Sequence, residues 1–262
     1  MHRRYREHTS RVVRDLDGIW DFAFLGDVDP DALEITGIVF NDRMVVPGCF
    51  DATPAYAGRR GLAAYRREII FRDASLHRLV LAGVHHWCRV FVDGHEVGDH
   101  AGGFTRFHFD LRDHEPGPAE LIVLVDNRFD YARSPLHHEY FDWYHYGGIA
   151  RGAELHCLGD HFIDAVKVVT ASLAPPEIAV SVSTSAEGET TTVPLSLTAD
   201  GDVLLEESVE VPASGATIER TLVLPGAALW TPRTQCPQEA HRGTQDRSNG
   251  PYWWRRDAHA AL

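Results

Sequence analysis

Short apolar runs recur along the first 160 residues, and most are bounded by Gly, Asp or Pro. They are rich in residues that favour β-strands, and none sustains a helical period over three turns. The runs are REIIF (67–71), HRLVLAGV (77–84), CRVFVDG (88–94), ELIVLVDN (120–127) and AELHCL (153–158). Two packed sheets can bury the inner faces of such strands, so the pattern predicts an all-β sandwich.

One connection in this region is more specific. In VFVDGHEV (90–97), Asp93 and Gly94 separate two short strand-like stretches. An Asp-Gly pair supplies the positive φ angles that a two-residue hairpin turn requires. The sequence therefore predicts a tight β-hairpin centred on these two residues.

A second block begins near Phe162 and largely alternates apolar and polar residues. Its runs are AVKVVTA (165–171), EIAVSVST (177–184), TTVPLSLTA (191–199), VLLEESVEV (203–211) and ATIERTLVL (216–224). The turn spacing is typical of an immunoglobulin-like sandwich. We place the boundary at residues 159–161, which predicts one domain over residues 1–159 and a second over 160–232.

The pattern is lost after Leu229-Trp230-Thr231-Pro232. Residues 233–262 are polar and without period, and their one strongly apolar feature is Tyr252-Trp253-Trp254. Such a segment cannot build a core alone, so the sequence predicts an irregular tail.

Charge and composition then limit the function. The formal net charge of −13, from 25 Lys and Arg against 38 Asp and Glu, argues against binding nucleic acid or anionic lipid. No apolar run is long enough to span a membrane, and residues 1–20 lack the apolar core of a secretory signal. The four cysteines (Cys49, Cys88, Cys157 and Cys236) form no CxxC pair. We expect free thiols and a cytoplasmic protein.

Metal and cofactor chemistry find little support. The 16 histidines include the adjacent pairs 85–86 and 137–138. Neighbouring side chains of a strand point to opposite faces, so an adjacent pair there could not grip one ion. No HExxH, GxSxG, P-loop or GxGxxG is present, and Gly102-Gly103 is interpreted as a turn between strands. We expect neither a metal nor a cofactor.

The stretch FDWYHYGGI (141–149) is the exception, because it sets the carboxylate of Asp142 among aromatic rings. A carboxylate can accept two sugar hydroxyls while aromatic faces cover the C–H face of a pyranose. A purely structural edge loop, whose aromatics fill the sandwich rim and whose Asp caps a turn, is the alternative, and the chemistry of the residues alone slightly favours it. Glu139 lies close to Asp142 in sequence, but we do not expect the two to form a catalytic acid/base pair.

The stretch also resembles a segment of glycoside hydrolase family 2, near the end of its N-terminal sugar-binding domain, and of its β-glucuronidases in particular. Other segments resemble the family in the same order, over roughly residues 15–232. They are LDGIWDF (16–22), VVPG (45–48) followed by AYRRE (64–68), VFVDG (90–94) with HAGGFT (100–105), and LWTP (229–232).

The resemblance implies a jelly-roll sandwich, then an immunoglobulin-like sandwich, then a (β/α)8 barrel that carries two catalytic glutamates. A barrel needs about 250 residues. The tail after Pro232 holds one Glu, Glu239, and no Asn-Glu pair, so no catalytic residue can be assigned. We expect the barrel to be absent, through a frame-shifted or early-ended reading or because the protein is a genuine stand-alone module.

What the resemblance does transfer is Asp142, whose counterpart in the family binds hydroxyls of the non-reducing-end sugar. Trp143 and His145 are further sugar-binding candidates. Trp143-Tyr144-His145 stand where Phe-Phe-Asn is common, and Gly48-Cys49-Phe50 where a Ser- or Asn-Trp pair is common. His145 in place of Asn changes a hydrogen-bonding position.

Three hypotheses follow. The chain is the N-terminal part of a retaining β-glycosidase, more β-glucuronidase-like than β-galactosidase-like and inactive alone. Alternatively it is a non-catalytic carbohydrate-binding or interaction module, or a non-functional fragment. The expected partner is a β-linked sugar or glycoside, and the resemblance also implies a homo-oligomer.

Overall fold

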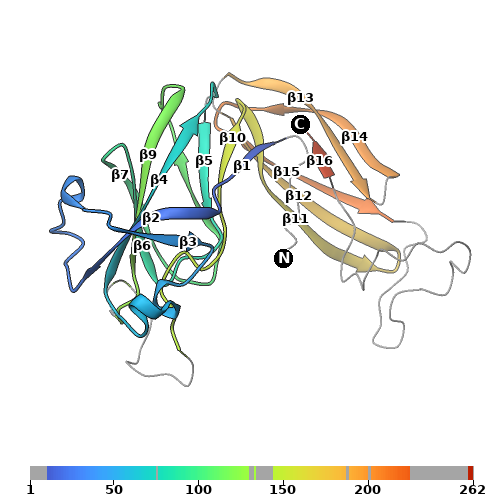
Figure 1. Cartoon of the computed structure of the whole chain (residues 1–262). Coiled ribbons are helices and arrows are strands. Elements are labelled where there is room, and N and C mark those ends of the chain that lie inside the picture. The colour runs from blue at the N-terminus through green and yellow to red at the C-terminus, as the bar shows by residue number, and fades with distance from the viewer. Residues whose placement is uncertain are drawn as a thin grey trace, which may run out of the picture. The chain divides into compact units, whose positions relative to one another are not determined.

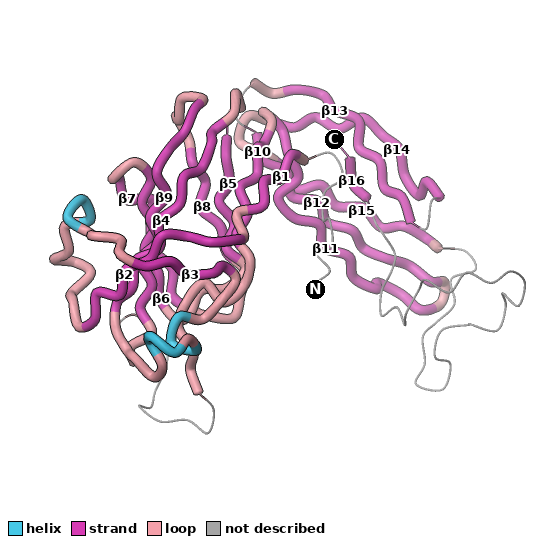
Figure 2. Tube along the Cα trace, in the orientation of Figure 1, coloured by secondary structure: helices cyan, strands magenta, loops and turns pink. Residues whose placement is uncertain are grey.

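The computed structural model describes residues 11–74, 76–129, 133, 144–186, 189–199, 202–224 and 259–261. Regular structure in this part of the chain is almost entirely β-strand, with single-turn 3-10 helices as the exception (Figure 2). These turns are η1 (Ile35–Gly37), η2 (Phe50–Ala52) and η3 (Pro54–Tyr56). The predicted all-β class is confirmed, and none of the described helices is long and apolar enough to cross a membrane.

The chain divides into two compact units, one formed by Arg11–Gly159 and the other containing Asp160 and the strands that follow it (Figure 1). In the first unit a four-stranded sheet has the order β1-β10-β5-β8 and a six-stranded sheet the order β3-β2-β4-β9-β6-β7, all antiparallel. The strands are β1 (Val12–Asp15), β2 (Gly18–Gly26), β3 (Asp42–Val46), β4 (Leu62–Phe71), β5 (Leu76–Leu81), β6 (Trp87–Val92), β7 (His95–Ala101), β8 (Phe107–Leu111), β9 (Gly117–Asp126) and β10 (Ala153–Leu158).

The main core of this unit lies between its two sheets. Leu121, Val123 and Val125 of β9 belong to it, together with the fully buried rings of Phe22 and Tyr65. Burying such side chains is the largest favourable term in folding, at roughly 1.5–3 kcal/mol each.

The other face of β9 is buried as well. Ile122 and Leu124 pack in a second cluster, which the segment between β2 and β3 covers with Val28, Leu33 and Ile38. This double burial explains why ELIVLV is a continuous apolar run and not an alternating one.

The predicted hairpin is present between β6 and β7. Asp93 has φ 47° and Gly94 has φ 81°, as a tight two-residue turn demands. The Asp93 carboxylate also accepts the backbone N–H of Glu120 at 2.7 Å. Gly102-Gly103 lies between β7 and β8, as the predicted turn requires.

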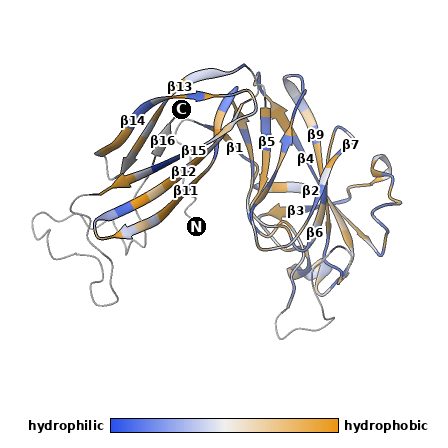
Figure 3. Ribbon diagram, turned by 180° about the vertical axis from the view of Figure 1, so that it is seen from behind, coloured by the Kyte–Doolittle hydropathy of each residue, from blue (hydrophilic) through white to orange (hydrophobic). Residues whose placement is uncertain are grey.

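The second unit contains the sheets β11-β12-β15 and β14-β13-β16. Its strands are β11 (His161–Leu173), β12 (Pro176–Ala186), β13 (Thr191–Ala199), β14 (Asp202–Val211), β15 (Ala216–Val223) and β16 (His259–Ala261). Alternate residues of β12, β13 and β14 form its core, among them Val182, Leu195 and Val211. Hydrophobic and hydrophilic residues alternate along strands of both units (Figure 3).

All ten strand segments predicted from the sequence are strands in the structure. The predicted irregular tail is described only at His259–Ala261, where β16 pairs with Ser196, Leu197 and Thr198 of β13. The rest of 233–262, with Leu229-Trp230-Thr231-Pro232, Cys236 and Glu239, lies outside the described residues. The other three cysteines, Cys49, Cys88 and Cys157, are free thiols.

Candidate functional site

The described part of FDWYHYGGI begins at Tyr144, and this segment (144–149) is held by backbone hydrogen bonds to two other loops. The N–H of Gly48 donates to the carbonyl of Ile149 at 2.8 Å, and the N–H of Phe50 donates to that of Gly147 at 2.9 Å. The N–H of His85 donates to the carbonyl of Gly148 at 3.0 Å. The loops after β3 and before β6 therefore fix the segment from both sides.

A buried carboxylate adds a third attachment. Asp51 is 3% exposed, and its Oδ1 accepts the N–H of Gly147 at 2.9 Å. Its Oδ2 accepts a hydrogen bond from Nδ2 of Asn127 at 3.0 Å. Oδ1 of Asn127 in turn accepts a hydrogen bond from the N–H of Gly61 at 2.9 Å. Burial raises the pKa of the Asp51 carboxyl, while the bonds from Gly147 and Asn127 and the nearby charge of Arg60 oppose the rise. Both carboxylate oxygens are thus occupied by structural hydrogen bonds.

The two glycines of the segment are required by close packing. A Cβ atom on Gly147 would stand 2.4 Å from the Cβ of Asn127. Gly148 has φ +139°, and a Cβ there would stand 2.6 Å from the carbonyl oxygen of Gly48. Only glycine allows the backbone to approach this closely and to take up that φ value.

Arg60 joins the segment to the end of β9. Its Nη1 donates to the carbonyl of Asn127 at 3.0 Å and to that of His145 at 2.7 Å. Its guanidinium lies 4.8 Å from the ring centroid of Phe129 and 4.9 Å from that of Tyr144. A cation held between aromatic faces and carbonyl oxygens is favourable electrostatically, so Arg60 stabilises the segment.

Two histidines, His85 and His86, pack with His145 of the segment. The ring centroids of His85 and His86 lie 5.4 Å apart, and those of His86 and His145 lie 4.7 Å apart. His85 and His86 lie just before β6 and outside any regular strand, so the opposite-face argument drawn from strand geometry was wrong for this pair. Within the described part of the chain, however, no three His, Cys, Asp or Glu side chains are placed to hold a metal ion.

The environment of His86 disfavours its charged form. The side chain is 2% exposed, and its Nε2 has no hydrogen-bond partner among the described residues. Burial first, then His145, His85 and Arg60, lower the pKa of His86 to about 3. Burial and Arg60 also lower the pKa of His145. Both rings are therefore neutral near pH 7.

The outer surface of this region carries aromatic rings. Tyr144 and Tyr146 are 45% and 44% exposed, with ring centroids 4.6 Å apart. Phe104 is 58% exposed and lies 4.9 Å from the ring of His85. Nδ1 of His85 is 2.8 Å from the carbonyl oxygen of Tyr146, which links the two groups of rings. Exposed apolar side chains gathered in this way are typical of a binding surface.

Of the site residues predicted from the sequence, the structure describes only His145. Asp142 and Trp143 lie outside the described residues, as does Glu139. His145 is described and is 3% exposed, packed against His86 and Phe129. The structure adds three residues that the sequence analysis did not name, Asp51, Arg60 and Asn127. A weak signal for one of them existed, because Asn127 ends the long apolar run ELIVLVDN.

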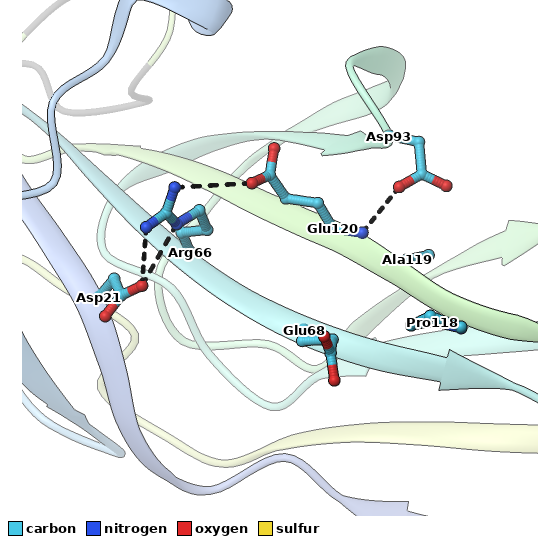
Figure 4. Close-up of a pocket in the computed structure, with 7 residues that line it drawn as sticks. All are labelled: Asp21, Arg66, Glu68, Asp93, Pro118, Ala119 and Glu120. Carbon is cyan, nitrogen blue, oxygen red and sulfur yellow. Dashed lines mark hydrogen bonds and ion pairs between the residues drawn. The ribbon is translucent and has the colours of Figure 1, made fainter.

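A separate hollow of about 310 Å³ lies over the outer face of β2, β4 and β9 (Figure 4). Arg66 stands between two acidic residues there, 2.9 Å from Asp21 and 3.7 Å from Glu120. These residues pair with one another across exposed strands, and none belongs to segment 144–149. The hollow is accounted for as a surface ion-pair network.

Comparison with known proteins gives the wider context. No family model matches the chain. It is 27% identical to a β-glucuronidase of Paenibacillus borealis and 25% identical to one of Chlorocebus aethiops, each over 87% of this chain. Those alignments span 41% and 40% of the two relatives, and a match to a putative β-glucuronidase of Formosa agariphila spans 15% of that protein. The chain thus spans about two fifths or less of the length of these relatives.

A solved structure is similar over most of the same residues. A GH2 β-galacturonidase from Eisenbergiella tayi superposes with a TM-score of 0.73 and 25% identity, over 90% of this chain and 41% of that one. In sequence, a match to a β-galactosidase of Thermoanaerobacter pseudethanolicus is 33% identical but covers only 38% of this chain. In fold and sequence the chain is similar to the N-terminal, β-sandwich part of these glycosidases. More particularly, it is similar to the N-terminal part of glycoside hydrolases of family 2, and it is more β-glucuronidase-like than β-galactosidase-like.

The packing of Gly147 generates a first prediction. Gly147→Ala should lower the free energy of unfolding of the first unit by about 1–3 kcal/mol, because the added methyl overpacks against Asn127. Urea unfolding followed through amide NMR signals of β4 and β9 measures it. Gly37→Ala is the matched control, since a Cβ at Gly37 meets nothing within 4 Å. Equal stability of the two variants would contradict the proposed packing.

The buried histidines generate a second prediction, on pH. The pKa of His86 is lower in the folded state than its ordinary value of 6.5, so the unfolded chain binds more protons between about pH 3 and 6.5. The stability from a neutral His86 is complete above pH 6.5 and decreases as the pH falls through that window, by at most about 1.4 kcal/mol per pH unit.

His86→Gln should therefore flatten the decline of the unfolding free energy between pH 6.5 and 4. Chemical unfolding at a series of pH values measures the slope. His95→Gln, in the exposed hairpin, serves as the control and should leave the slope as it is in the unsubstituted protein. An unchanged slope in His86→Gln would show that His86 is not held neutral.

Proposed function

We propose that this chain supplies the sugar-contacting, non-catalytic part of a retaining β-glycosidase of family 2, and that Asp142 accepts hydroxyls of the non-reducing-end sugar. The observation that carries the proposal is the attachment of segment 144–149, next to Asp142, to a rigid sandwich through Asp51, Asn127 and Arg60. A contact residue on a loop is precise only when rigid elements support that loop.

The described residues support a binding role over a catalytic one. Retaining hydrolysis needs an acid/base carboxyl group and a nucleophilic carboxylate about 5 Å apart. Asp51 is the buried carboxylate beside the segment, and its oxygens are occupied by Gly147 and Asn127. We therefore assign Asp51 a structural role and place the catalytic pair in the barrel that the family resemblance implies.

A uronic acid is the substrate class that the comparisons favour. The β-glucuronidases of Paenibacillus borealis and Chlorocebus aethiops align over 87% of this chain, whereas the β-galactosidase match covers 38%. One Eisenbergiella tayi structure is a β-galacturonidase bound to galacturonate. We propose a terminal β-linked uronide as the ligand, with Trp143 as a further contact.

For His145 we propose a supporting role in place of the direct sugar contact expected from the sequence. Its ring is 3% exposed, and its carbonyl accepts a hydrogen bond from Arg60. A side chain packed against His86 and Phe129 sets the position of the segment and presents little surface to a ligand.

A stand-alone carbohydrate-binding module is the second candidate, and the exposed rings of Phe104, Tyr144 and Tyr146 favour it. Aromatic faces of this kind can cover the C–H face of a pyranose without any catalytic partner. Under this reading the chain would act in the cytoplasm as a binding protein, and sugar affinity alone would be its function.

Substitution of Asp142 tests both candidates. Methyl β-glucuronide should shift the amide NMR signals of Gly147 and Gly148 with millimolar affinity, since a single loop buries little of a sugar. Asp142→Asn should abolish these shifts, because the amide accepts fewer hydroxyl hydrogen bonds. Asp113→Asn is the control, since Asp113 lies in an exposed turn with φ 58°, which Asn also tolerates. Shifts that persist in Asp142→Asn would contradict the assignment.

The same purified chain should not hydrolyse chromogenic β-glucuronides or β-galactosides, because the proposal places the catalytic pair elsewhere. Robust turnover that survives purification would contradict that placement. Sugar binding without turnover agrees with both candidates, and an absence of binding at millimolar sugar would remove the binding module.

A further inference from the structure

The imidazole ring of His85 is attached to segment 144–149. Its Nδ1 lies 2.8 Å from the carbonyl oxygen of Tyr146. The backbone of His85 forms an isolated antiparallel bridge with Gly148, with hydrogen bonds of 3.0 and 3.3 Å. The ring and the backbone are therefore both fixed to the segment that begins two residues after Asp142 in the sequence.

Neighbouring groups also restrict rotation of this ring. The His86 ring stacks against it, with centroids 5.4 Å apart and an interplanar angle of 14°. The Phe104 ring lies 4.9 Å away. A Cβ atom at Gly103 would stand 2.6 Å from Cδ2 of His85, so the glycine backbone packs closely against the edge of the ring. The imidazole is thus held in one position.

The Phe104 ring beside His85 belongs to a loop that is itself held. The N–H of Gly102 donates to the carbonyl of His86 at 2.8 Å, and Nη1 of Arg151 donates to the carbonyl of Phe104 at 3.1 Å. Although its backbone is tied in this way, Phe104 is 58% exposed. A fixed aromatic ring beside a fixed polar group suits a sugar, which has apolar C–H faces and polar hydroxyls.

The contact with Tyr146 also determines which ring nitrogen of His85 carries the proton. A carbonyl oxygen can only accept a hydrogen bond, so Nδ1 is the protonated nitrogen. In the neutral ring Nε2 then has a lone pair and no hydrogen. Nε2 has no hydrogen-bond partner among the described residues, and the His85 side chain is only half-buried, in contrast to that of His86. The ring therefore offers one acceptor to a ligand.

An acceptor of this kind discriminates between the polar groups of a sugar. It can take a hydrogen bond from a hydroxyl group, whereas a carboxylate has no hydrogen to donate. Of the groups on a terminal uronide, a ring hydroxyl is thus the one that fits Nε2 of His85, and the carboxylate is not.

We propose that Nε2 of His85 accepts a hydrogen bond from a hydroxyl of the sugar, with the Phe104 ring against a C–H face of the same sugar. This inference rests on the proposed function, because its ligand is the β-linked uronide proposed there. It adds a contact that determines specificity, since a sugar without that hydroxyl leaves Nε2 unpaired.

Nitrogen-15 NMR of the histidine rings at pH 8 tests the acceptor without any substitution. In the full chain Nδ1 of His85 should be protonated and Nε2 unprotonated. Methyl β-glucuronide should shift the Nε2 signal toward that of a hydrogen-bonded nitrogen. A proton on Nε2 in the free protein, or an Nε2 signal that bound sugar leaves unchanged, would overturn the proposal.

Substitution separates the binding role of His85 from its structural one. His85→Asn keeps an N–H that can donate to the Tyr146 carbonyl in place of Nδ1, but it removes the acceptor at Nε2. The Kd of methyl β-glucuronide should rise about 3- to 10-fold, as expected for one hydrogen bond, while the amide signals of Tyr146 and Gly148 stay in place. His95→Asn, in the exposed hairpin, is the matched control and should leave the Kd unchanged.

Deoxy analogues of methyl β-glucuronide identify the hydroxyl. One analogue should bind the unsubstituted chain about 3- to 10-fold more weakly than the parent sugar, yet bind His85→Asn as well as the parent does, because both changes remove the same hydrogen bond. Sugar binding that Asp142→Asn abolishes but His85→Asn leaves unchanged would overturn this inference alone. An absence of sugar binding in the unsubstituted chain would overturn the proposed function together with it.

Discussion

The buried carboxylate of Asp51 is the contact on which the candidate site depends. It accepts hydrogen bonds from the N–H of Gly147 and the side chain of Asn127 while almost fully removed from water. Removing a carboxylate from water costs free energy unless hydrogen bonds satisfy its oxygens. The folded state therefore keeps the donors of Gly147 and Asn127 in place beside Asp51. The interaction ties segment 144–149 to two loops at one end of the first sandwich.

The sandwich makes this arrangement possible because each partner sits at the end of a buried element. Asn127 directly follows β9, whose two faces are both covered by apolar side chains. Asp51 lies in the 3-10 turn η2 next to the buried ring of Phe50. Segment 144–149 therefore adjoins a frame of buried elements. The corresponding N-terminal region of family-2 β-glucuronidases is similar to this chain in sequence and fold.

Much of the fold was predictable from the sequence, because strand signals there are local. Asp93-Gly94 predicted a hairpin that the structure contains, and the alternating pattern from Ala165 onward predicted the strands of the second unit. The hydrogen bonds that hold segment 144–149 in place could not be predicted in this way. Asp51 and Asn127 are 76 residues apart, and their bond depends on tertiary packing that no local pattern encodes.

Hydrogen exchange at the Gly147 amide is the most direct test of this account. In the unsubstituted chain the amide should be protected, since its proton is held by Asp51 in a buried site. In Asp51→Asn, an NH₂ group faces one of the two donors, the N–H of Gly147 or the side-chain amide of Asn127, and cannot accept its hydrogen bond. Protection of the Gly147 amide should therefore fall by about 10- to 100-fold, corresponding to the roughly 1–3 kcal/mol of an unsatisfied buried group. Asp31→Asn, at an exposed ion pair, should change nothing at Gly147. Free exchange in the unsubstituted chain, or unchanged protection in Asp51→Asn, would contradict the central role of the buried carboxylate.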